Sequence, residues 1–397
     1  MSKRYQGGIL GVGFDPLKAP NAPTGVTATG GDASATVSFT APSNVGGSAI
    51  TGYTGQSNPG GIAATGSSSP LTFSGLSNGT AYTFNVWALN SYGPSPAGGL
   101  SGSVTPAAPR GLFGGGLASS RENVIDYVTL ATTGNATDFG DLTGARYSVT
   151  GCASSVRGTW GGGYGTAESN VIDYVTVAST GNATDFGDLT LSRYGPAGFN
   201  SSTRGVFAGG DAASGSTSVI DYITIATTGN ATSFGNLTLA RGGLAGCSSP
   251  TRGLAGGGFT TVRVNVIDYV TIASTGNATD FGDLSTGIAG LSACSSPTRG
   301  LFGGGETNAA IVNTINYVTI ATTGNSTNFG SLTVARYYLA ACSSNTRGLF
   351  SGGTTGSNSN VIDYVTIDTT GNATDFGDLT LARAFIGACS NANGGLA

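Results

Sequence analysis

The sequence predicts an all-β protein, and three observations lead to that prediction. The 397 residues include 69 glycines, and the abundance of Thr, Ser, Val and Ala beside them is typical of short strands joined by tight turns. No long amphipathic helical pattern is found along the chain. From residue 110 the sequence repeats six times with a period of 47 or 48 residues, which fits the four-stranded blade of a β-propeller.

The composition divides the chain into three segments. Residues 1–20 form an N-terminal arm, residues 21–106 a first domain, and residues 107–397 the repeat array. The segment "TPAAP" at 105–109 is predicted to be a short, stiff linker, because proline restricts the backbone.

The first domain contains alternating strand patterns, of which "AYTFNVWALN" at 81–90 is the clearest. The surrounding segment, 76–95, resembles the fibronectin type III signature. The matching residues are Leu76, Gly79, Thr80, Tyr82, Val86, Ala88 and Asn90. The resemblance implies a β-sandwich in which Tyr82 occupies the corner that ties two strands together, and in which Phe39 replaces the early tryptophan of the family. Such domains are mostly spacers or adhesive modules.

Each repeat is predicted to contain four strands. In the fifth repeat these cover 299–305, 314–320, 327–333 and 336–344. Glycine triplets, an Asp-Tyr strand and a trailing arginine resemble the kelch repeat, although Phe139 and its equivalents stand near the place of the usual outer tryptophan. The resemblance implies a six-bladed kelch-like propeller.

The ends of the array predict how the propeller closes. The array begins with the second strand of a blade, at 110–116, and ends with a first strand, "RAFIGACS" at 383–390. Six complete blades therefore require the C-terminal strand to pair with the N-terminal strands at 110–143, which leaves no open ring edge. Both faces of "VIDYVTI" at 124–130 are largely apolar, as expected for a strand packed between two neighbouring blades.

Several classes of function are disfavoured by composition. The chain has no histidine, which removes Ser-His-Asp and Cys-His catalysis and histidine-ligated metals. Charged residues make up 9% of the chain and the net charge is −4, so we expect no nucleic-acid partner. No run of apolar residues approaches a membrane span or follows the N-terminal charges as in a signal peptide, so we expect neither membrane insertion nor export by a cleaved signal.

Five cysteines recur with the repeat, at 152, 247, 294, 342 and 389, and Phe199 stands at the sixth equivalent position. Equivalent positions on separate blades are poorly placed to pair, and no CxxC motif is present to hold a metal. We predict that the cysteines are buried free thiols acting as small apolar groups. No cofactor is expected.

Repetition also argues that the most conspicuous polar motifs are framework. The arginine of the Arg-Gly pair occurs in all six repeats, and the aspartate of the Asp-Tyr pair occurs in five, with Asn316 in the other. A hydrogen bond from one to the other or to the backbone would explain this uniformity. The Asn-Ala/Ser-Thr triplets, although of the glycan-acceptor type, are interpreted as Gly-Asn hairpin turns.

The paired acids of the Asp138 and Asp141 type change together to Ser or Asn in two repeats. Capping of turns by short polar side chains explains this exchange, because Asp, Ser and Asn all accept hydrogen bonds from local backbone. Weak calcium binding at these acids is the alternative.

Variation among the repeats is concentrated in the loops between the second and third strands. A rigid framework with diverging loops is typical of a recognition surface. Drift in unconstrained loops is the alternative explanation of the same pattern. The candidate partner-binding residues in these loops are Arg121, Tyr164, Glu168, Asp211, Phe259, Arg263 and Glu306.

The combination of arm, fibronectin-type domain and "IDYVTIATTGNATDFGDLT" repeats resembles structural proteins of tailed phages, particularly those of marine cyanophage type. The resemblance implies a non-enzymatic virion protein, an appendage, fibre or decoration, assembled in the host cytoplasm. The arm would dock on other virion proteins, and its candidate anchor residues are Arg4, Tyr5, Ile9, Phe14 and Leu17. The propeller would project outward and contact a glycan or protein of the host surface.

Two other classes of function are weighed against this one. The first is a lectin-like or receptor-binding adhesin that uses the variable loops. The second is an enzyme on a propeller, which is disfavoured because a kelch-type copper oxidase needs histidine ligands and a hydrolase needs paired acids in one unique pocket. The sequence leaves homo-oligomerisation open.

Overall fold

The computed structural model describes residues 17–396, in two compact units that divide between Ala108 and Pro109. The described residues form β-strands and one short 3₁₀-helix, η1 (Gly394–Leu396). No helix in this part of the chain is long and apolar enough to cross a membrane. The prediction of an all-β protein is confirmed, and each unit is considered separately below.

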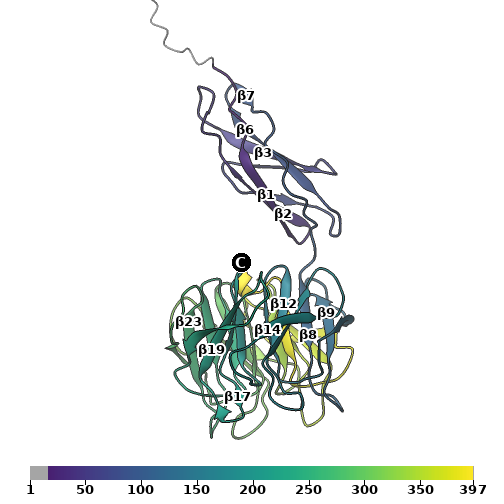
Figure 1. Cartoon of the computed structure of the whole chain (residues 1–397), viewed down its shortest axis with the longest axis vertical. Helices are drawn as coiled ribbons and strands as arrows, with labels where there is room; N and C mark the ends of the chain where they lie inside the picture. The colour runs from purple at the N-terminus through teal and green to yellow at the C-terminus, as the bar shows by residue number, and fades with distance from the viewer. Residues whose placement is uncertain (1–16, 397) are drawn as a thin grey trace, which may run out of the picture. The chain divides into compact units, whose positions relative to one another are not determined.

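The first unit is a sandwich of two antiparallel sheets (Figure 1). The three-stranded sheet contains β1 (Thr24–Gly31), β2 (Ser34–Thr40) and β5 (Leu71–Ser74) in the order β1-β2-β5. The four-stranded sheet contains β3 (Gly52–Asn58), β4 (Ala63–Gly66), β6 (Thr83–Asn90) and β7 (Gly93–Pro94) in the order β4-β3-β6-β7.

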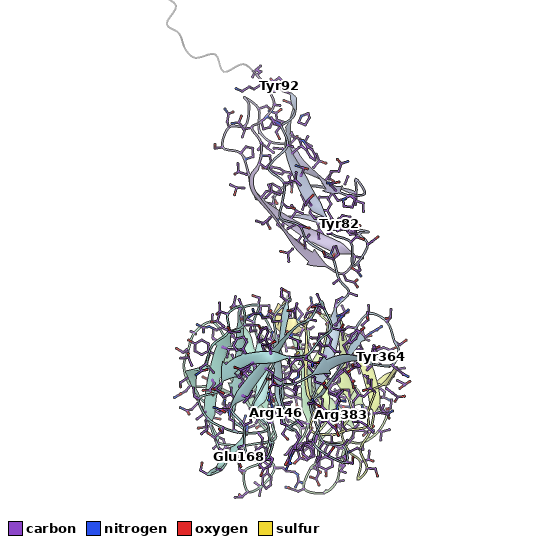
Figure 2. The ribbon with its side chains drawn as sticks, turned by 45° about the vertical axis from the view of Figure 1, so that its right-hand side comes forward. Tyr82, Tyr92, Arg146, Glu168, Tyr364 and Arg383 are labelled. Atoms are coloured by element: carbon purple, nitrogen blue, oxygen red, sulfur yellow. The ribbon has the colours of Figure 1, made fainter. Side chains whose placement is uncertain are left out.

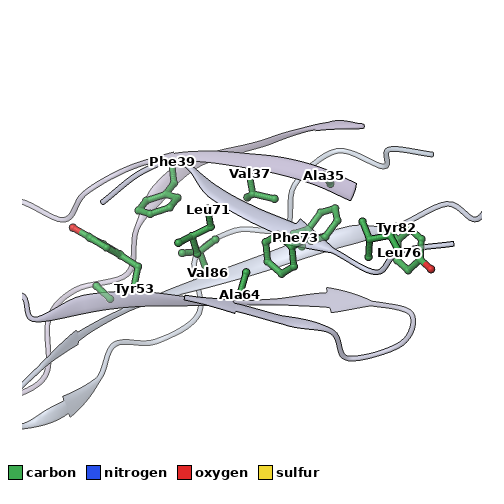
Figure 3. Close-up of a cluster of buried hydrophobic side chains, with 12 residues drawn as sticks. Ala35, Val37, Phe39, Tyr53, Ala64, Leu71, Phe73, Leu76, Tyr82 and Val86 are labelled. Atoms are coloured by element: carbon green, nitrogen blue, oxygen red, sulfur yellow. The ribbon is translucent and has the colours of Figure 1, made fainter. Parts of the chain in front are cut away.

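Strict alternation along the strands produces the core of this sandwich. Every second residue of β2 and of β6 is buried, because side chains of period two point alternately to the two faces of a sheet. Figure 3 shows the resulting cluster between the sheets, in which the rings of Phe39 and Tyr53 lie 4.7 Å apart. Phe39 therefore fills the core as the sequence predicts.

Tyr82 closes one corner of the sandwich. Its ring is buried and its hydroxyl accepts a hydrogen bond of 3.0 Å from the backbone N–H of Ser77. This contact joins the turn before β6 to the start of that strand, which is the corner role predicted from the sequence.

The second unit contains six antiparallel sheets of four strands each. The first is β8 (Arg110–Gly114), β9 (Val124–Thr129), β10 (Thr137–Asp141) and β33 (Gly387–Ser390). The second is β11 (Thr150–Ala153), β12 (Arg157–Gly161), β13 (Val171–Thr176) and β14 (Thr184–Asp188). The third is β15 (Ala197–Asn200), β16 (Arg204–Ala208), β19 (Val219–Thr224) and β20 (Thr232–Asn236).

The remaining three sheets repeat the same order. The fourth is β21 (Ala245–Ser248), β22 (Arg252–Gly256), β23 (Val266–Thr271) and β24 (Thr279–Asp283). The fifth is β25 (Ser292–Ser295), β26 (Arg299–Gly303), β27 (Thr314–Thr319) and β28 (Thr327–Ser331). The sixth is β29 (Ala340–Ser343), β30 (Arg347–Ser351), β31 (Val361–Thr366) and β32 (Thr374–Asp378). A small hairpin, β17 (Asp211–Ala212) with β18 (Gly215–Ser216), extends from the third sheet.

The first of these sheets is built from both ends of the array. Strand β33 pairs antiparallel with β8, so that Cys389 lies opposite Leu112 and Gly387 opposite Gly114. Strands β8, β9 and β10 complete the order β10-β9-β8-β33. The pairing between the C-terminal strand and the N-terminal strands of the array is the one predicted from the sequence.

The strands that follow each crossover are shorter than the sequence predicts. In the fifth repeat a strand is expected over 336–344, but β29 begins only at Ala340. Residues 336–339 instead carry the chain from one sheet to the next, and Tyr338 has a left-handed backbone with φ of 52°, which no regular strand accommodates.

Buried aspartates anchor these crossovers. In each of five sheets the aspartate of the third strand pairs with the trailing arginine of the segment that enters that sheet, and all five aspartates are fully buried. The pairs are Arg146–Asp173 (2.8 Å), Arg193–Asp221 (3.0 Å), Arg241–Asp268 (3.0 Å), Arg336–Asp363 (2.8 Å) and Arg383–Asp126 (3.1 Å). Each of the same aspartates also accepts a hydrogen bond from a threonine hydroxyl just after the preceding sheet.

The fifth sheet lacks this pair altogether. Ile288 stands in place of the arginine and Asn316 in place of the aspartate. Ile288 is buried in an apolar cluster, and the side-chain oxygen of Asn316 has no hydrogen-bond partner among the described residues. The two ions are lost together, as expected if either one alone would leave a buried charge uncompensated.

The arginine of each Arg-Gly pair bonds to backbone, which is one of the two partners that the sequence predicts. It does not bond to the Asp-Tyr aspartate; its guanidinium lies over the ring of the paired tyrosine, as Arg110 does 4.6 Å from the centre of Tyr127. It then donates to a backbone carbonyl of the next sheet, as Arg110 does to Val177 and Arg347 does to Leu130. Of the two alternatives, the bond to backbone is therefore confirmed.

The "TGNAT" segments protect the outer edge of each sheet. Gly134 and Ala136 donate backbone hydrogen bonds to Phe376 and Asp378 of the preceding sheet. The side-chain oxygen of Asn135 accepts a further bond from the backbone of Asp378. The same three bonds recur around the array, so the edge that would template aggregation is covered.

This contact corrects the interpretation of the paired acids. Asp138 and Asp141 lie in strand β10, not in a turn. The backbone N–H of Asp141 donates to Asn182, and Ser331 at the equivalent position donates to Asn372 in the same way. Because the bond uses the backbone, it survives the exchange of Asp for Ser or Asn.

The corner tyrosine yields a stability prediction for the first unit. Tyr82→Phe removes the acceptor for the Ser77 N–H, and the unfolding free energy of this unit should fall by about 1–3 kcal/mol. Calorimetry of the full chain measures its transition. Tyr92→Phe, at a residue that is 49% exposed, should change it by less than about 0.5 kcal/mol. Equal effects of the two variants would contradict the corner role.

The crossover anchors yield a second prediction. Asp363→Asn leaves the Arg336 charge buried, and the second unit should lose about 3–5 kcal/mol of stability. Adding Arg336→Ile to this variant reproduces the side chains of the fifth sheet and should recover most of that loss. Urea unfolding of the single and double variants measures the coupling, and additive losses would show that the pair is not the anchor.

Candidate functional site

The second unit contains a cavity of about 470 Å³ at one end of its innermost strands. Its depth is lined by one small residue from each of the six sheets: Gly151, Gly198, Gly246, Ala293, Ala341 and Ala388. Its opening, called the mouth below, includes Asp211 of β17. In Figure 1 the β17 hairpin lies at the end of this unit opposite the C-terminus, and Figure 2 shows Glu168 at that same end.

A cycle of six backbone hydrogen bonds surrounds the mouth. Each bond joins the crossover of one sheet to the crossover of the next, and the bonds run from Ser148 to Phe385, Gly195 to Ser148, Gly243 to Gly195, Gly290 to Gly243, Tyr338 to Gly290 and Phe385 to Tyr338. All six residues have φ between 52° and 62°. Because all six residues share this left-handed backbone, the N–H and the C=O of each one point toward its two neighbours in the cycle.

Three of these six positions are not glycine. Ser148, Tyr338 and Phe385 have φ of 53°, 52° and 58°, a conformation that costs about 1–2 kcal/mol for a residue with a Cβ atom. The other three sheets use glycine at the same place and avoid this cost. Strain retained at one part of a repeated structure is typical of functional sites.

Two of these strained residues, Tyr338 and Phe385, form an aromatic wall together with Tyr147, and the wall is defined by these three residues. The rings of Tyr338 and Phe385 are stacked with centres 3.9 Å apart, and Tyr147 meets Phe385 edge-on at 5.5 Å. All three residues line the cavity and are half-buried. The glycines at 195, 243 and 290 leave the remaining part of the cycle without side chains.

The variable loops lie beside this wall. In each sheet the first loop residue pairs with the residue that follows the trailing arginine, as in Tyr147 with Tyr164 and Tyr194 with Asp211. Of the seven predicted binding residues, four occupy this first position and line or adjoin the mouth: Tyr164, Asp211, Phe259 and Glu306. Arg121, Glu168 and Arg263 occupy the returning side of their loops.

Three of the predicted residues form a charged rim, defined as Asp211, Arg263 and Glu306. These are the charged residues among the described residues that line the cavity, and two carboxylates against one guanidinium leave one net negative charge. Arg263 and Glu306 form an ion pair between the fourth and fifth sheets. Asp211 accepts a hydrogen bond of 2.6 Å from the hydroxyl of Ser216.

Electrostatic effects reflect how closely these groups face one another. Burial raises the pKa of Tyr338, and Tyr337, Glu306 and Asp211 raise it further, while Arg263 opposes them. Burial likewise raises the pKa of Asp211, against the hydrogen bond from Ser216. The aromatic wall and the charged rim therefore share one partly desolvated space.

Of the other predicted residues, Phe259 lines the cavity, whereas Arg121, Tyr164 and Glu168 lie outside its lining. Tyr164 contacts Tyr147 and Tyr194 with ring centres 5.5 and 5.6 Å away, and Arg121 lies 5.8 Å from the centre of the Tyr164 ring. Glu168 pairs with Tyr164 across the small loop. The structure thus brings the loop residues of the second to fifth sheets together around the mouth.

Sequence reasoning missed the aromatic wall. The residues after the trailing arginine were assigned to a strand, although the triplets that begin at this position differ in every repeat: "RYS", "RYG", "RGG", "IAG", "RYY" and "RAF". Variation inside an otherwise constant segment was the available signal.

At the other end of the innermost strands, away from the mouth, the space between the strands is nearly filled. The cavity there is about 50 Å³ and is lined by the cysteines at 247, 294, 342 and 389. Asn393 of the C-terminal segment donates to Ser390 and exchanges hydrogen bonds with Asn200. Gly394 and Gly395 are buried against the same strands. The mouth therefore leads into a blind pocket.

All five cysteines are free and buried, as predicted. Burial raises the pKa of the Cys152 and Cys247 thiols to about 12, so thiolate chemistry is suppressed near neutral pH. Among the described residues, no group of three or more acidic or cysteine side chains is placed to hold a metal ion.

The candidate anchor residues are largely untested. Arg4, Tyr5, Ile9 and Phe14 lie outside the described residues. Leu17 is 57% exposed. Residues 18–20, which were assigned to the arm, adjoin the sandwich: the N–H of Lys18 donates to Gly46, and its carbonyl accepts from Asn90.

A two-sheet antiparallel sandwich with a tyrosine corner belongs to the immunoglobulin-like class of folds. Residues 21–98 match the family model of the fibronectin type III domain, and this part of the chain is such a domain. Domains of this family are usually non-catalytic modules. No curated protein matches the chain.

The strained aromatic position provides a test of the cycle around the mouth. Glycine avoids the left-handed penalty, so Tyr338→Gly should be more stable than Tyr338→Ala by about 1 kcal/mol. At Ala341, in strand β29, replacement by glycine should have the opposite sign and cost about 0.5–1 kcal/mol. Urea unfolding measures both differences, and a more stable alanine variant at 338 would contradict the strain.

Proposed function

We propose that the second unit is a six-bladed, kelch-like β-propeller. Six four-stranded sheets, the pairing of β33 with β8 and the hydrogen bonds that link each sheet to the next support this architecture. The sequence period of 47 or 48 residues supports it independently. The glycine pairs, the Asp-Tyr strand and the trailing arginine favour the kelch type, although an edge-on contact between this tyrosine and a phenylalanine of the outer strand takes the place of the outer tryptophan.

On this proposal, the chain is a non-enzymatic recognition protein, and its propeller presents one binding face. The observation that carries the proposal is the distribution of variation. Near-identical repeats differ most at the first loop residue and at the two residues after the trailing arginine, and these positions surround the mouth. Constant contacts between the sheets together with variable residues around an opening are typical of a rigid scaffold that carries a binding surface.

The biological setting is proposed from the resemblance to tailed-phage structural proteins. The chain would be a virion component, an appendage, fibre or decoration, assembled in the host cytoplasm. Its N-terminal residues would dock on other virion proteins, the fibronectin type III domain would act as a spacer, and the propeller would contact the host surface. A free-standing adhesin with the same mouth is the second candidate, and it is favoured by the same rim variation.

Removal of the N-terminal residues tests the virion role. Deletion of 1–16 spares Lys18 and Asn21, which hydrogen-bond within the first unit, so the fold should be retained. Incorporation into particles of the phage that encodes the chain should fall below about a tenth of wild type, since the docking segment is absent. Quantitative immunoblotting of purified particles measures it.

A matched variant separates docking from recognition. Exchange of the first loop residues, for example Phe259→Thr with Glu306→Thr, should leave incorporation intact and reduce adsorption to host cells. Full occupancy of particles by the deletion variant would contradict the arm as anchor. Unchanged adsorption after exchange of every first loop residue would contradict the mouth as the recognition face.

A further inference from the structure

The mouth breaks the symmetry of the repeats in a way that defines a binding site with two unlike sides. The aromatic wall occupies one part of the hydrogen-bonded cycle, and the three glycines occupy the other, beside the charged rim. The ring of Tyr338 lies over Gly290, close enough that a Cβ atom there would be 3.1 Å from it. The ring of Tyr338 therefore occupies space that Gly290, which has no side chain, leaves free.

The size and depth of the cavity restrict what can enter. A volume of about 470 Å³ lies within the range of roughly 300–1,000 Å³ found for small-molecule sites. The C-terminal segment nearly fills the opposite end, where the cavity measures about 50 Å³. A polymer therefore cannot pass through the channel, and only the end of a chain can enter.

The chemistry of the lining selects the class of ligand. Aromatic faces offer apolar contact with a flat ring, while carboxylates accept hydrogen bonds and a guanidinium donates them. The single net negative charge of the charged rim disfavours phosphate, sulfate and carboxylate groups. A neutral ring with apolar C–H faces and hydroxyls around its edge satisfies both sides of the mouth.

A quaternary ammonium group is a weaker fit to the same residues. Aromatic cages surround such a cation with several ring faces. Here Tyr338 and Phe385 are stacked on each other at an interplanar angle of 24°, so one face of each ring is covered and the two rings form a flat wall, not a cage around a cation. The cavity is also much larger than one ammonium group requires.

We propose that the mouth binds the exposed end of a neutral oligosaccharide, with a terminal sugar ring stacked on the aromatic wall and its hydroxyls bonded to the charged rim. This inference rests on the proposed recognition function and names the ligand for it. The strain at Tyr338 and Phe385 is then the cost of holding two rings where a sugar can stack.

Titration calorimetry of the full-length protein tests the inference. The probes are neutral trisaccharides of glucose, galactose, mannose and N-acetylglucosamine, with choline and a sulfated trisaccharide for comparison. At least one neutral trisaccharide should bind, and Phe385→Gly should weaken it about tenfold or more, the loss expected for an aromatic stacking contact. Phe385→Gly adopts the residue found in three other sheets and should fold.

A second variant and a control make the result specific. Asp211→Asn keeps the shape of the rim and should also weaken binding about tenfold or more, the loss expected for a hydrogen bond to a charged group. Val156→Ala changes a residue that is 58% exposed in the turn between β11 and β12 and should leave the affinity unchanged. Binding that survives both mouth variants would overturn the inference.

The remaining outcomes separate this inference from the proposed function. Preferential binding of choline or of the sulfated sugar, or no sugar binding at all, would overturn the neutral-glycan assignment. If host adsorption still depended on the first loop residues, the recognition function would stand with a protein partner. Sugar binding without incorporation into particles would support the glycan site and contradict the virion role.

Discussion

The structure of the second unit depends on polar contacts that tie each sheet to the next and the sixth to the first. Sheet edges and crossovers carry backbone groups that need partners, and three sets of contacts supply them. Buried Arg–Asp pairs hold the crossovers, the Arg-Gly guanidinium bonds the next sheet, and the "TGNAT" backbone covers the outer edge. Because each set repeats, neighbouring sheets meet through nearly the same interface, which is why the repeats differ so little along the strands.

Because the repeated contacts between sheets do not involve the side chains at the mouth, those side chains can differ from repeat to repeat. The cycle of six hydrogen bonds uses backbone atoms only, so it constrains the side chains at those positions through the left-handed backbone and not through a hydrogen bond to the side chain. Glycine meets that constraint at lowest cost. Where Tyr338 and Phe385 replace it, the surrounding anchors hold the strained backbone in place, and the penalty of about 1–2 kcal/mol for each residue is small beside the contacts that fix the crossover.

The sequence predicts the architecture better than it predicts the site. A single sequence contains the local patterns that predict strand alternation and the corner role of Tyr82. Counting its strands predicts the pairing of 383–390 with 110–116. The partner of each repeated charge does not follow from the pattern of any single repeat, because strands β11 and β12 lie between Arg146 and Asp173 in the sequence. The aromatic wall was missed for a related reason: Tyr147, Tyr338 and Phe385 converge only through the cycle, and no local pattern encodes that convergence.

The fifth sheet carries a signal that was visible before the structure. Ile288 and Asn316 are the only departures from the arginine and aspartate at their respective positions, and both fall in one sheet. Two independent substitutions would seldom coincide, whereas the loss of one member of a buried pair makes the other a liability. Coincident exceptions among internal repeats therefore identify contacting residues in one sequence. At the mouth no such coincidence marks the ion pair of Arg263 and Glu306, because the loop positions vary among the repeats and have no constant residue to depart from.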